Sequence, residues 1–243
     1  MVTAIMERQN YSKIVNRPNL VVELVGPAGA GKTSLVQALK QHSNRVQVGT
    51  PPYFRRIGHM PFFVKNTLLL LPTFFHLLQK DHGRWLTLQE MAWMVILKGW
   101  HKVLGRTVSQ DNKILVLDQG PIFLLARLYG FGPEILKSQG TKKWWNNMYR
   151  QWADMLNLAI WVDASDTTLL KRVRTREIWH GNKERNDLEA FEFLARWRIS
   201  LEQVISALEA NGSGLKVIRF DTARESLHEI VHRVYAALSL KNS

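Results

Sequence analysis

The chain has 243 residues, of which 46% are hydrophobic and 22% charged, a composition typical of one sizeable globular domain. It contains no cysteine, which excludes disulfide bonds and thiolate metal sites. Lys and Arg outnumber Asp and Glu by 33 to 20, and the net charge of +13 favours an anionic partner such as a nucleotide, a nucleic acid or an anionic membrane surface, although solubility alone would also explain it.

The distribution of apolar residues bears on the cellular location of the protein. Residues 1–18 contain no uninterrupted apolar run, which argues against a secretory signal. Residues 62–78 are the most apolar stretch, but polar residues and a proline interrupt them, so they fall short of the roughly 20 apolar residues of a membrane-spanning helix. We therefore expect a cytoplasmic protein, and peripheral attachment to a membrane stays open.

Five short apolar runs without polar alternation predict buried parallel strands. Helical spacing between these runs, first over Thr33–Gln41, predicts repeated β-α-β units and therefore a doubly wound α/β fold with a five-stranded parallel sheet. The predicted strands are Leu20–Val25, Arg45–Val48, Ile114–Leu117, Leu158–Val162 and Leu215–Phe220.

The connection between the second and third predicted strands is much longer than the others. At roughly 65 residues it is too long for a structureless loop in a compact domain, and it is rich in Leu, Phe and Trp. We therefore predict a large helical insertion over residues 50–110. With no repeat or linker in the sequence, residues 1–243 form a single domain whose core is 18–49 and 111–243.

The most specific motif is G-x-x-x-x-G-K-[ST], which lies between the first predicted strand and the first predicted helix. Its glycines allow backbone N–H groups to point at phosphates, and the N-terminus of the next helix adds a positive dipole end. Lys32 would reach the β- and γ-phosphates of ATP, and the Thr33 hydroxyl would ligate Mg²⁺. The residues predicted to bind the nucleotide here are Gly26, Pro27, Ala28, Gly29, Ala30, Gly31, Lys32, Thr33 and Ser34.

The third strand runs into Asp118, which Gln119 follows. A carboxylate at the end of a strand beside the phosphate loop can hold Mg²⁺ or accept the proton of a substrate hydroxyl. An ATPase motor would usually place Glu directly after this Asp to activate water, and no guanine-reading N-K-x-D motif is present. The pattern favours phosphoryl transfer over hydrolysis, and helix capping by Asp118 is the alternative.

A basic run follows the fourth strand. Arg172 and Arg176 are four residues apart, so they share one helix face, whereas Arg174 points elsewhere. Two guanidinium groups on one face can clamp a polyphosphate and offset the charge on a transferring phosphoryl group. We predict a lid over about residues 172–187, and a solvated basic face is the alternative.

Three stretches resemble the nucleoside and nucleotide kinases of the P-loop class, and thymidylate kinases in particular: residues 21–39, 114–121 and 159–177. The resemblance implies the strand order 2-3-1-4-5, ATP and Mg²⁺ as cofactors, and a small-molecule acceptor bound by residues 50–110. By this resemblance Lys32, Asp118, Arg172 and Arg176 are catalytic, Thr33 and Asp118 hold the metal, and Arg174, Asp221, Thr222 and Ala223 bind the nucleotide. It also makes a homodimer plausible.

The acceptor is the least determined part of this interpretation. Arg55 and Arg56 stand near the expected entrance of the acceptor pocket, where they would hold an anionic acceptor, and a solvated pair is the alternative. Gln119 replaces an arginine that these families commonly carry, and Ala28 replaces a frequent acidic residue of thymidylate kinases. These departures put a standard nucleotide in doubt and leave a nucleoside, a sugar or a polar lipid head group open.

Two other functions stay open from the sequence. The first is a nucleic-acid-directed end-kinase or binding protein, in which the basic charge follows a phosphate backbone. The second is a non-catalytic ATP-binding protein at an anionic membrane surface. No nucleic-acid-binding module is legible in the sequence, so we rank nucleic acid below a small-molecule acceptor.

Overall fold

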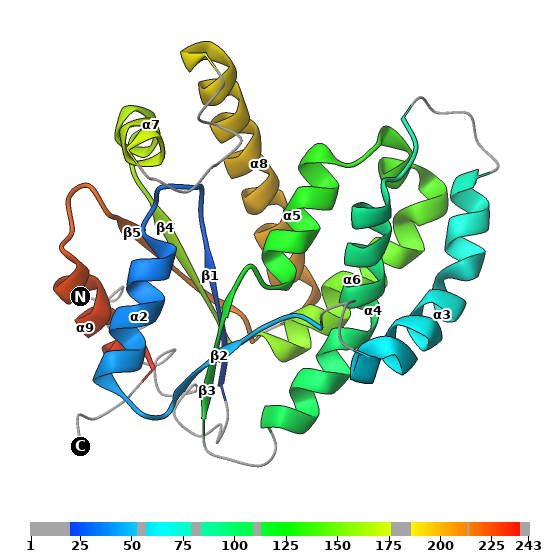
Figure 1. Ribbon diagram of the computed structural model, residues 1–243, viewed down its shortest axis with the longest axis horizontal. Coiled ribbons are helices and arrows are strands. Elements are labelled where there is room, and N and C mark those ends of the chain that lie inside the picture. Colours follow the sequence, from blue (N-terminus) through cyan, green and yellow to red (C-terminus); the bar gives the residue numbers. More distant parts are fainter. Residues whose placement is uncertain are drawn as a thin grey trace.

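The computed structural model describes residues 20–52, 57–78, 84–108, 113–175, 186–212 and 214–238. In these ranges, each strand is followed by one or more helices, and the helices surround one sheet (Figure 1). In chain order the elements are β1 (Leu20–Val25), α2 (Lys32–His42), β2 (Val46–Gly49), η1 (Ile57–His59), α3 (Met60–Leu78), α4 (Leu88–Val108), β3 (Ile114–Asp118), α5 (Pro121–Phe131), η2 (Glu134–Lys137), η3 (Gln139–Thr141), α6 (Lys142–Met155), β4 (Leu158–Asp163), α7 (Asp166–Arg174), α8 (Asp187–Asn211), β5 (Lys216–Asp221) and α9 (Leu227–Ala237).

The five strands form one parallel sheet in the order β2-β3-β1-β4-β5. This confirms both the predicted doubly wound fold class and the predicted strand order. The central strand β1 has β3 on one side and β4 on the other, so the direction of winding reverses beside it. The carboxyl ends of these three strands therefore meet at a topological switch point, where open α/β sheets bind their ligands.

The predicted strands match the structure closely, except in the burial of the two edges. β1, β3 and β4 are almost wholly buried, as their apolar sequences predict. The prediction of buried strands is wrong for β2 and β5, which are mostly half-buried or exposed. Each of these strands lies at an edge of the sheet, so only one neighbouring strand covers it.

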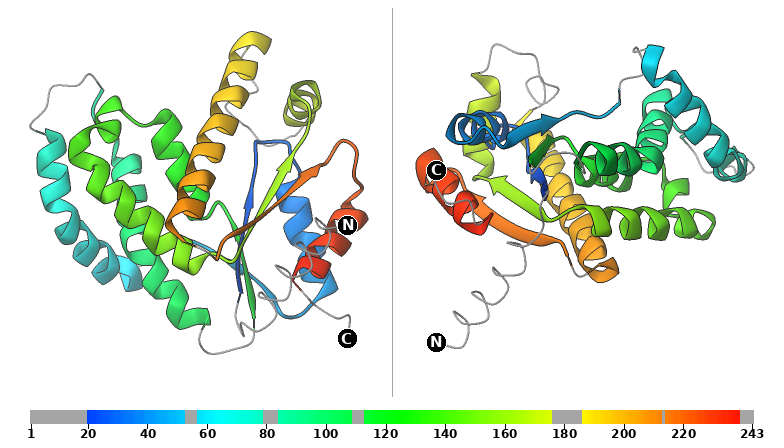
Figure 2. Two further views of the ribbon diagram at one scale, coloured as in Figure 1. Left: turned by 180° about the vertical axis from the view of Figure 1, so that it is seen from behind. Right: turned by 90° about the horizontal axis from the view of Figure 1, so that it is seen from below.

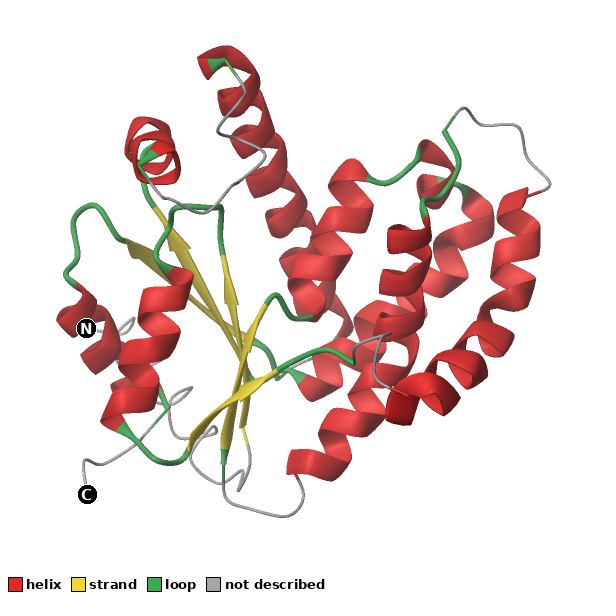
Figure 3. Ribbon diagram, in the orientation of Figure 1, coloured by secondary structure: helices red, strands yellow, loops and turns green. Residues whose placement is uncertain are grey.

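Side chains of β1 alternate between two apolar layers. Leu20, Val22 and Leu24 join a cluster with α2 and α9, whereas Val21 and Val25 join a second cluster with α4, α5, α6 and α8. Figures 2 and 3 show the resulting three layers, with helices covering both faces of the sheet. The burial of both faces explains why β1 carries no polar alternation.

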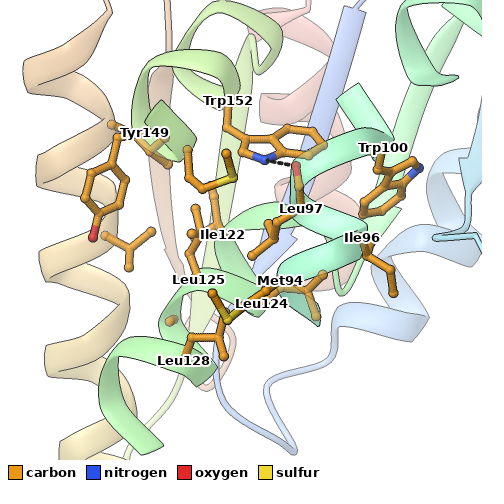
Figure 4. Close-up of a cluster of buried hydrophobic side chains, with 14 of the residues drawn as sticks. Met94, Ile96, Leu97, Trp100, Ile122, Leu124, Leu125, Leu128, Tyr149 and Trp152 are labelled. Carbon is orange, nitrogen blue, oxygen red and sulfur yellow. Dashed lines mark hydrogen bonds between the residues drawn. The ribbon is translucent and has the colours of Figure 1, made fainter. Parts of the chain in front are cut away.

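The long connection forms its own helices, as predicted. α3 packs against α4, and α4 in turn packs against α5 and α6. The rings of Trp100 on α4 and Trp152 on α6 meet edge to face, with centroids 5.8 Å apart, and the Trp152 indole donates a hydrogen bond to the Leu97 carbonyl (Figure 4). Within the described ranges, no helix combines the length and the apolar character needed to cross a membrane.

Substitution of Trp152 tests this second layer. The side chain is 0% exposed, so Trp152→Ala should lower the free energy of unfolding by about 3–5 kcal/mol through cavity formation. Trp85→Ala is the matched control, because Trp85 is 57% exposed and its loss should cost about 0.5 kcal/mol or less. Urea unfolding of both variants measures the difference, and equal losses would contradict the packing described here.

Candidate active site

The loop between β1 and α2 packs closely against β4 and α7. Gly26 and Gly29 have φ angles of 140° and 86°, a region that other residues rarely adopt. A Cβ at Gly26 would collide with the Val162 carbonyl oxygen on β4, and one at Gly29 would lie 2.8 Å from the Leu169 carbonyl oxygen on α7. Glycine is therefore required at both positions of the motif, because neighbouring backbone atoms leave no room for a side chain.

Two features of the loop bear on phosphate binding. The Lys32 ammonium donates hydrogen bonds of 2.8 Å to the carbonyl oxygens of Gly26 and Pro27, so the lysine side chain folds back along the loop. Among the described residues, no side chain caps the N-terminus of α2, so its first-turn N–H groups are suited to an anionic ligand. Ala30, in contrast, is buried in the core behind the loop.

A cavity of about 240 Å³ opens beside the loop. One of its walls consists of the phosphate loop and the end of β3, and the opposite wall comes from α5 and α8. It is lined by Gly26, Ala28, Gly29, Gly31, Lys32, Thr33, Asp118, Gln119, Phe123, Arg127, Phe193 and Trp197.

The wall opposite the phosphate loop is aromatic, but its residues were not predicted, and none of them comes from the predicted acceptor region at 50–110. Phe123 and Trp197 meet edge to face with ring centroids 5.3 Å apart. The Arg127 guanidinium lies over the ring of Phe131, 5.2 Å from its centroid, a cation–π contact that holds the side chain beside the cavity. A sequence signal existed, because each helix contributes two lining residues four positions apart: Phe123 and Arg127 on α5, Phe193 and Trp197 on α8.

Asp118 brings a carboxylate to this cavity. Its Oδ1 atom is buried and has no hydrogen-bond partner within the described part of the chain. Gln119 follows with φ of 70°, the one positive value among the described residues other than glycine, and it lines the same cavity. An oxygen without a protein partner beside Lys32 and Thr33 fits the chemistry of a Mg²⁺ ligand or of a proton acceptor.

The sequence analysis missed Glu23, the one acidic residue of β1. The side chain is fully buried, and its two oxygens accept hydrogen bonds from the backbone N–H groups of Ile122 and Phe123 at 2.8 and 2.9 Å. Burial raises the pKa of Glu23 to about 8; the negative charge of Asp118 adds to the rise, and the backbone hydrogen bonds oppose it. A single acid inside an otherwise apolar strand was the available signal.

Arg172 links the phosphate loop to the turn after β5. Its guanidinium donates to the Thr222 hydroxyl and carbonyl oxygens at 2.8 and 2.9 Å, and to the Gly29 carbonyl oxygen at 3.3 Å. Together with Ser34 and Thr222 it lines a second cavity of about 420 Å³ next to the loop. Asp221 shapes the turn instead, because its carboxylate accepts the N–H of Ala223 at 2.9 Å.

The other arginines predicted to bind ligands either lie away from the two cavities or fall outside the described residues. Arg174 forms an ion pair of 2.6 Å with Asp187, so it joins the end of α7 to the start of α8. Arg174 lines neither of the two cavities beside the phosphate loop. Arg55, Arg56 and Arg176 lie outside the described residues, so their roles stay predictions.

A second unpredicted group fixes the position of α8. Arg198 pairs with Asp163 at the end of β4, at 2.7 Å, and with Asp166 at the start of α7, at 2.5 Å. Its hydrogen bond to Asp163 contributes most to raising the pKa of the Arg198 guanidinium above its ordinary value. The neighbouring residue Trp197 is thereby held at the cavity wall.

Comparison with known proteins bears on the fold. No protein-family model matches this chain, and no curated protein matches it. Among solved structures, thymidylate kinase from Candida albicans is similar over 91% of this chain and 91% of its own length, with 11% identity and a TM-score of 0.53. NadR in complex with NR is similar over 93% of this chain and 53% of its own, with 14% identity and a TM-score of 0.51.

The fold is that of a thymidylate kinase-like P-loop kinase. A deoxyadenosine kinase from M. mycoides with bound dATP also matches, over 90% of this chain and 99% of its own, with 12% identity and a TM-score of 0.46. In the P-loop kinase fold of this chain, the glycine-rich loop, Asp118 and Arg172 surround the switch point of the sheet.

The pKa of Glu23 predicts a pH dependence of stability. The pKa in the folded state, about 8, exceeds the ordinary value of 4.5, so the folded protein binds more protons between these values. Stability should therefore fall as pH rises from about 4.5 to about 8, by a few kcal/mol, since one pKa unit corresponds to about 1.4 kcal/mol. The Glu23→Gln variant lacks this contribution.

Urea unfolding of both proteins across this pH range measures the effect. The free energy of unfolding of the wild type, minus that of Glu23→Gln, should decline with rising pH. Parallel curves for the two proteins would show that Glu23 does not titrate in this range.

Proposed function

We propose that this chain is an ATP-dependent phosphotransferase whose acceptor is a nucleoside or a nucleotide. The observation that carries the proposal is the single cavity that joins the phosphate loop, Lys32 and Asp118 to an aromatic wall. A donor phosphate and a planar acceptor held in one cavity would lie close enough to react, which is the main requirement of phosphoryl transfer. The fold it shares with thymidylate kinase is consistent with this activity.

The residues around the loop suit ATP and magnesium. The uncapped N-terminus of α2 and the backbone of the glycine-rich loop would bind the phosphates, and Lys32 would leave its two carbonyl partners for the β- and γ-phosphates. Thr33 and Asp118 would hold Mg²⁺, which when bound offsets the charge of the phosphate oxygens. The cavity beside Arg172 and Thr222 would take the adenine, since a planar guanidinium stacks on an aromatic ring.

Asp118 is suited to receive the proton of the attacking hydroxyl. As the acceptor oxygen forms its bond to the γ-phosphorus, the bond from that phosphorus to the leaving ADP oxygen breaks. Asp118 takes the hydroxyl proton, and the Lys32 cation stabilises the charge that moves from the phosphoryl group to ADP. The unpartnered Oδ1 of Asp118 is the structural support for this role.

The wall of α5 and α8 favours an acceptor with a planar ring. Phe123, Phe193 and Trp197 offer ring faces and edges for stacking, and Arg127 adds a fixed cation. Gln119, next to Asp118, is neutral where an arginine would attract an acceptor phosphate. Because the position directly after Asp118 is neutral and the Arg127 guanidinium is held over the Phe131 ring, we propose that a nucleoside hydroxyl is a better acceptor than a nucleoside monophosphate.

An ADP-release assay tests the proposed function. Purified protein with Mg-ATP is supplied separately with pools of nucleosides, nucleoside monophosphates, sugars and lipid head groups. We expect turnover with the nucleoside pool, and we expect Lys32→Ala to lower kcat about 100-fold or more because it removes a cation that stabilises the transition state. ATP binding without any acceptor-dependent release of ADP would contradict the proposal.

Substitution of Asp118 separates catalysis from binding. Asp118→Asn keeps the shape of the side chain but removes its ability to take a proton, so kcat should fall about 100-fold to 10,000-fold. Asp154→Asn on the exposed face of α6 is the matched control and should retain full turnover. Steady-state kinetics with the best acceptor measure both variants, and full activity of Asp118→Asn would exclude this role.

A further inference from the structure

We propose that Glu23 is a positioning residue of this active site: from the centre of β1 it caps α5 and fixes the turn of Asp118, Gln119 and Gly120, so that Asp118 and the α5 side chains face the phosphate loop. The kinetic consequence rests on the proposed function. The positioning itself rests on contacts within the described residues and can be measured without any substrate.

The N-terminus of α5 depends on Glu23 for its hydrogen bonds. An α-helix leaves its first N–H groups without partners in the helix itself. The first residue of α5, Pro121, has no N–H, and the Leu124 N–H already bonds to the Gly120 carbonyl at 3.1 Å. The two remaining N–H groups, of Ile122 and Phe123, both donate to the Glu23 carboxyl group.

This cap differs from the local side-chain caps of α7, α8 and α9. Ser165 caps α7, Asn186 caps α8 and Ser226 caps α9, each through its own side chain directly before the helix. The corresponding residue of α5 is Gly120, which has no side chain to offer. The cap is supplied instead from a different strand, 99 residues earlier in the chain.

The space around Gly120 is matched to Glu23. A Cβ at Gly120 would lie 2.6 Å from Cδ and 2.7 Å from Oε2 of Glu23, closer than side chains approach. The buried carboxyl group and a local capping side chain therefore exclude one another. Because Glu23 occupies this space, the turn must pass directly over it on its way from β3 to α5.

The turn that Glu23 supports carries the proposed chemistry. Its middle residue, Gln119, has a positive φ of 70°, a conformation that persists only where its surroundings impose it. Asp118 precedes it, and Phe123, which itself donates to Glu23, lines the cavity. Three residues after Glu23 the same strand enters the phosphate loop at Gly26, so one strand sets the positions of both walls of the cavity.

Hydrogen exchange tests the positioning directly. In Glu23→Ala the backbone amides of Ile122 and Phe123 should exchange at least about tenfold faster than in the wild type, because their acceptor is lost. Asn157→Ala is the matched control: Asn157 is also buried and accepts the Val21 N–H at 2.8 Å, but at the opposite end of β1. Unchanged exchange at Ile122 and Phe123 in Glu23→Ala would overturn the proposal.

A compensating substitution separates positioning from general stability. Glu23→Ala frees the space beside Gly120, so the double variant Glu23→Ala/Gly120→Ser can cap α5 locally through the serine hydroxyl. The φ of −82° at Gly120 allows a serine there. The double variant should regain slow exchange at Phe123, whereas Gly120→Ser alone should clash with Glu23. Failure of the double variant to restore protection, although it folds, would contradict the capping role.

Steady-state kinetics with Mg-ATP and the pool of nucleosides measure the effect of Glu23 on turnover. Glu23→Ala should lower kcat about 100-fold through a displaced Asp118, with the KM for ATP changed by no more than about twofold, and the double variant should recover part of kcat. Asn157→Ala should keep the wild-type kcat. If the wild type shows no turnover, the proposed function fails while hydrogen exchange still decides the positioning; if exchange changes but kcat does not, Glu23 is structural only.

Discussion

The close approach of the Gly26 backbone to the Val162 carbonyl on β4 is the constraint on which the site depends. β1 is the central strand, with β3 and β4 hydrogen-bonded to its two edges, so its following loop can leave the sheet only at the switch point. At that point there is no room for a Cβ, and the chain must turn with a positive φ. On the other side of β1, the pairing of Leu24 with Asp118 brings the end of β3 to the same loop.

Two ionisable side chains, Glu23 (fully buried) and Arg198 (half-buried), then hold the helices that complete the cavity. Glu23 accepts hydrogen bonds from the N-terminus of α5. Arg198 on α8 forms ion pairs with Asp163 at the end of β4 and with Asp166 at the start of α7. Such interactions require good geometry, since a buried polar group without a hydrogen-bond partner destabilises the fold. Each fixes a helix that contributes an aromatic residue to the cavity, Phe123 on α5 and Trp197 on α8, so the position of the acceptor wall is tied to the sheet itself.

The sequence predicted the core well because local patterns specify it. Apolar runs such as Leu20–Val25 and the glycine motif before Lys32 are contiguous in the chain, and their geometry follows from a few residues. The acceptor wall could not be predicted in this way, because it forms where α5 and α8 meet, about 70 residues apart in sequence. Glu23 was missed for the same reason: its partners at Ile122 and Phe123 become neighbours only through the pairing of β1 with β3.

A phosphotransferase with this cavity would transfer the γ-phosphoryl group of ATP to an organic acceptor and would not hydrolyse ATP. The most direct measurement follows the γ-phosphoryl group of ³²P-labelled Mg-ATP in the presence of a nucleoside mixture, with separation of the products. The label should appear in a nucleoside monophosphate, in an amount that depends on the nucleoside. Label found in inorganic phosphate alone, at a rate that nucleosides do not change, would contradict this prediction.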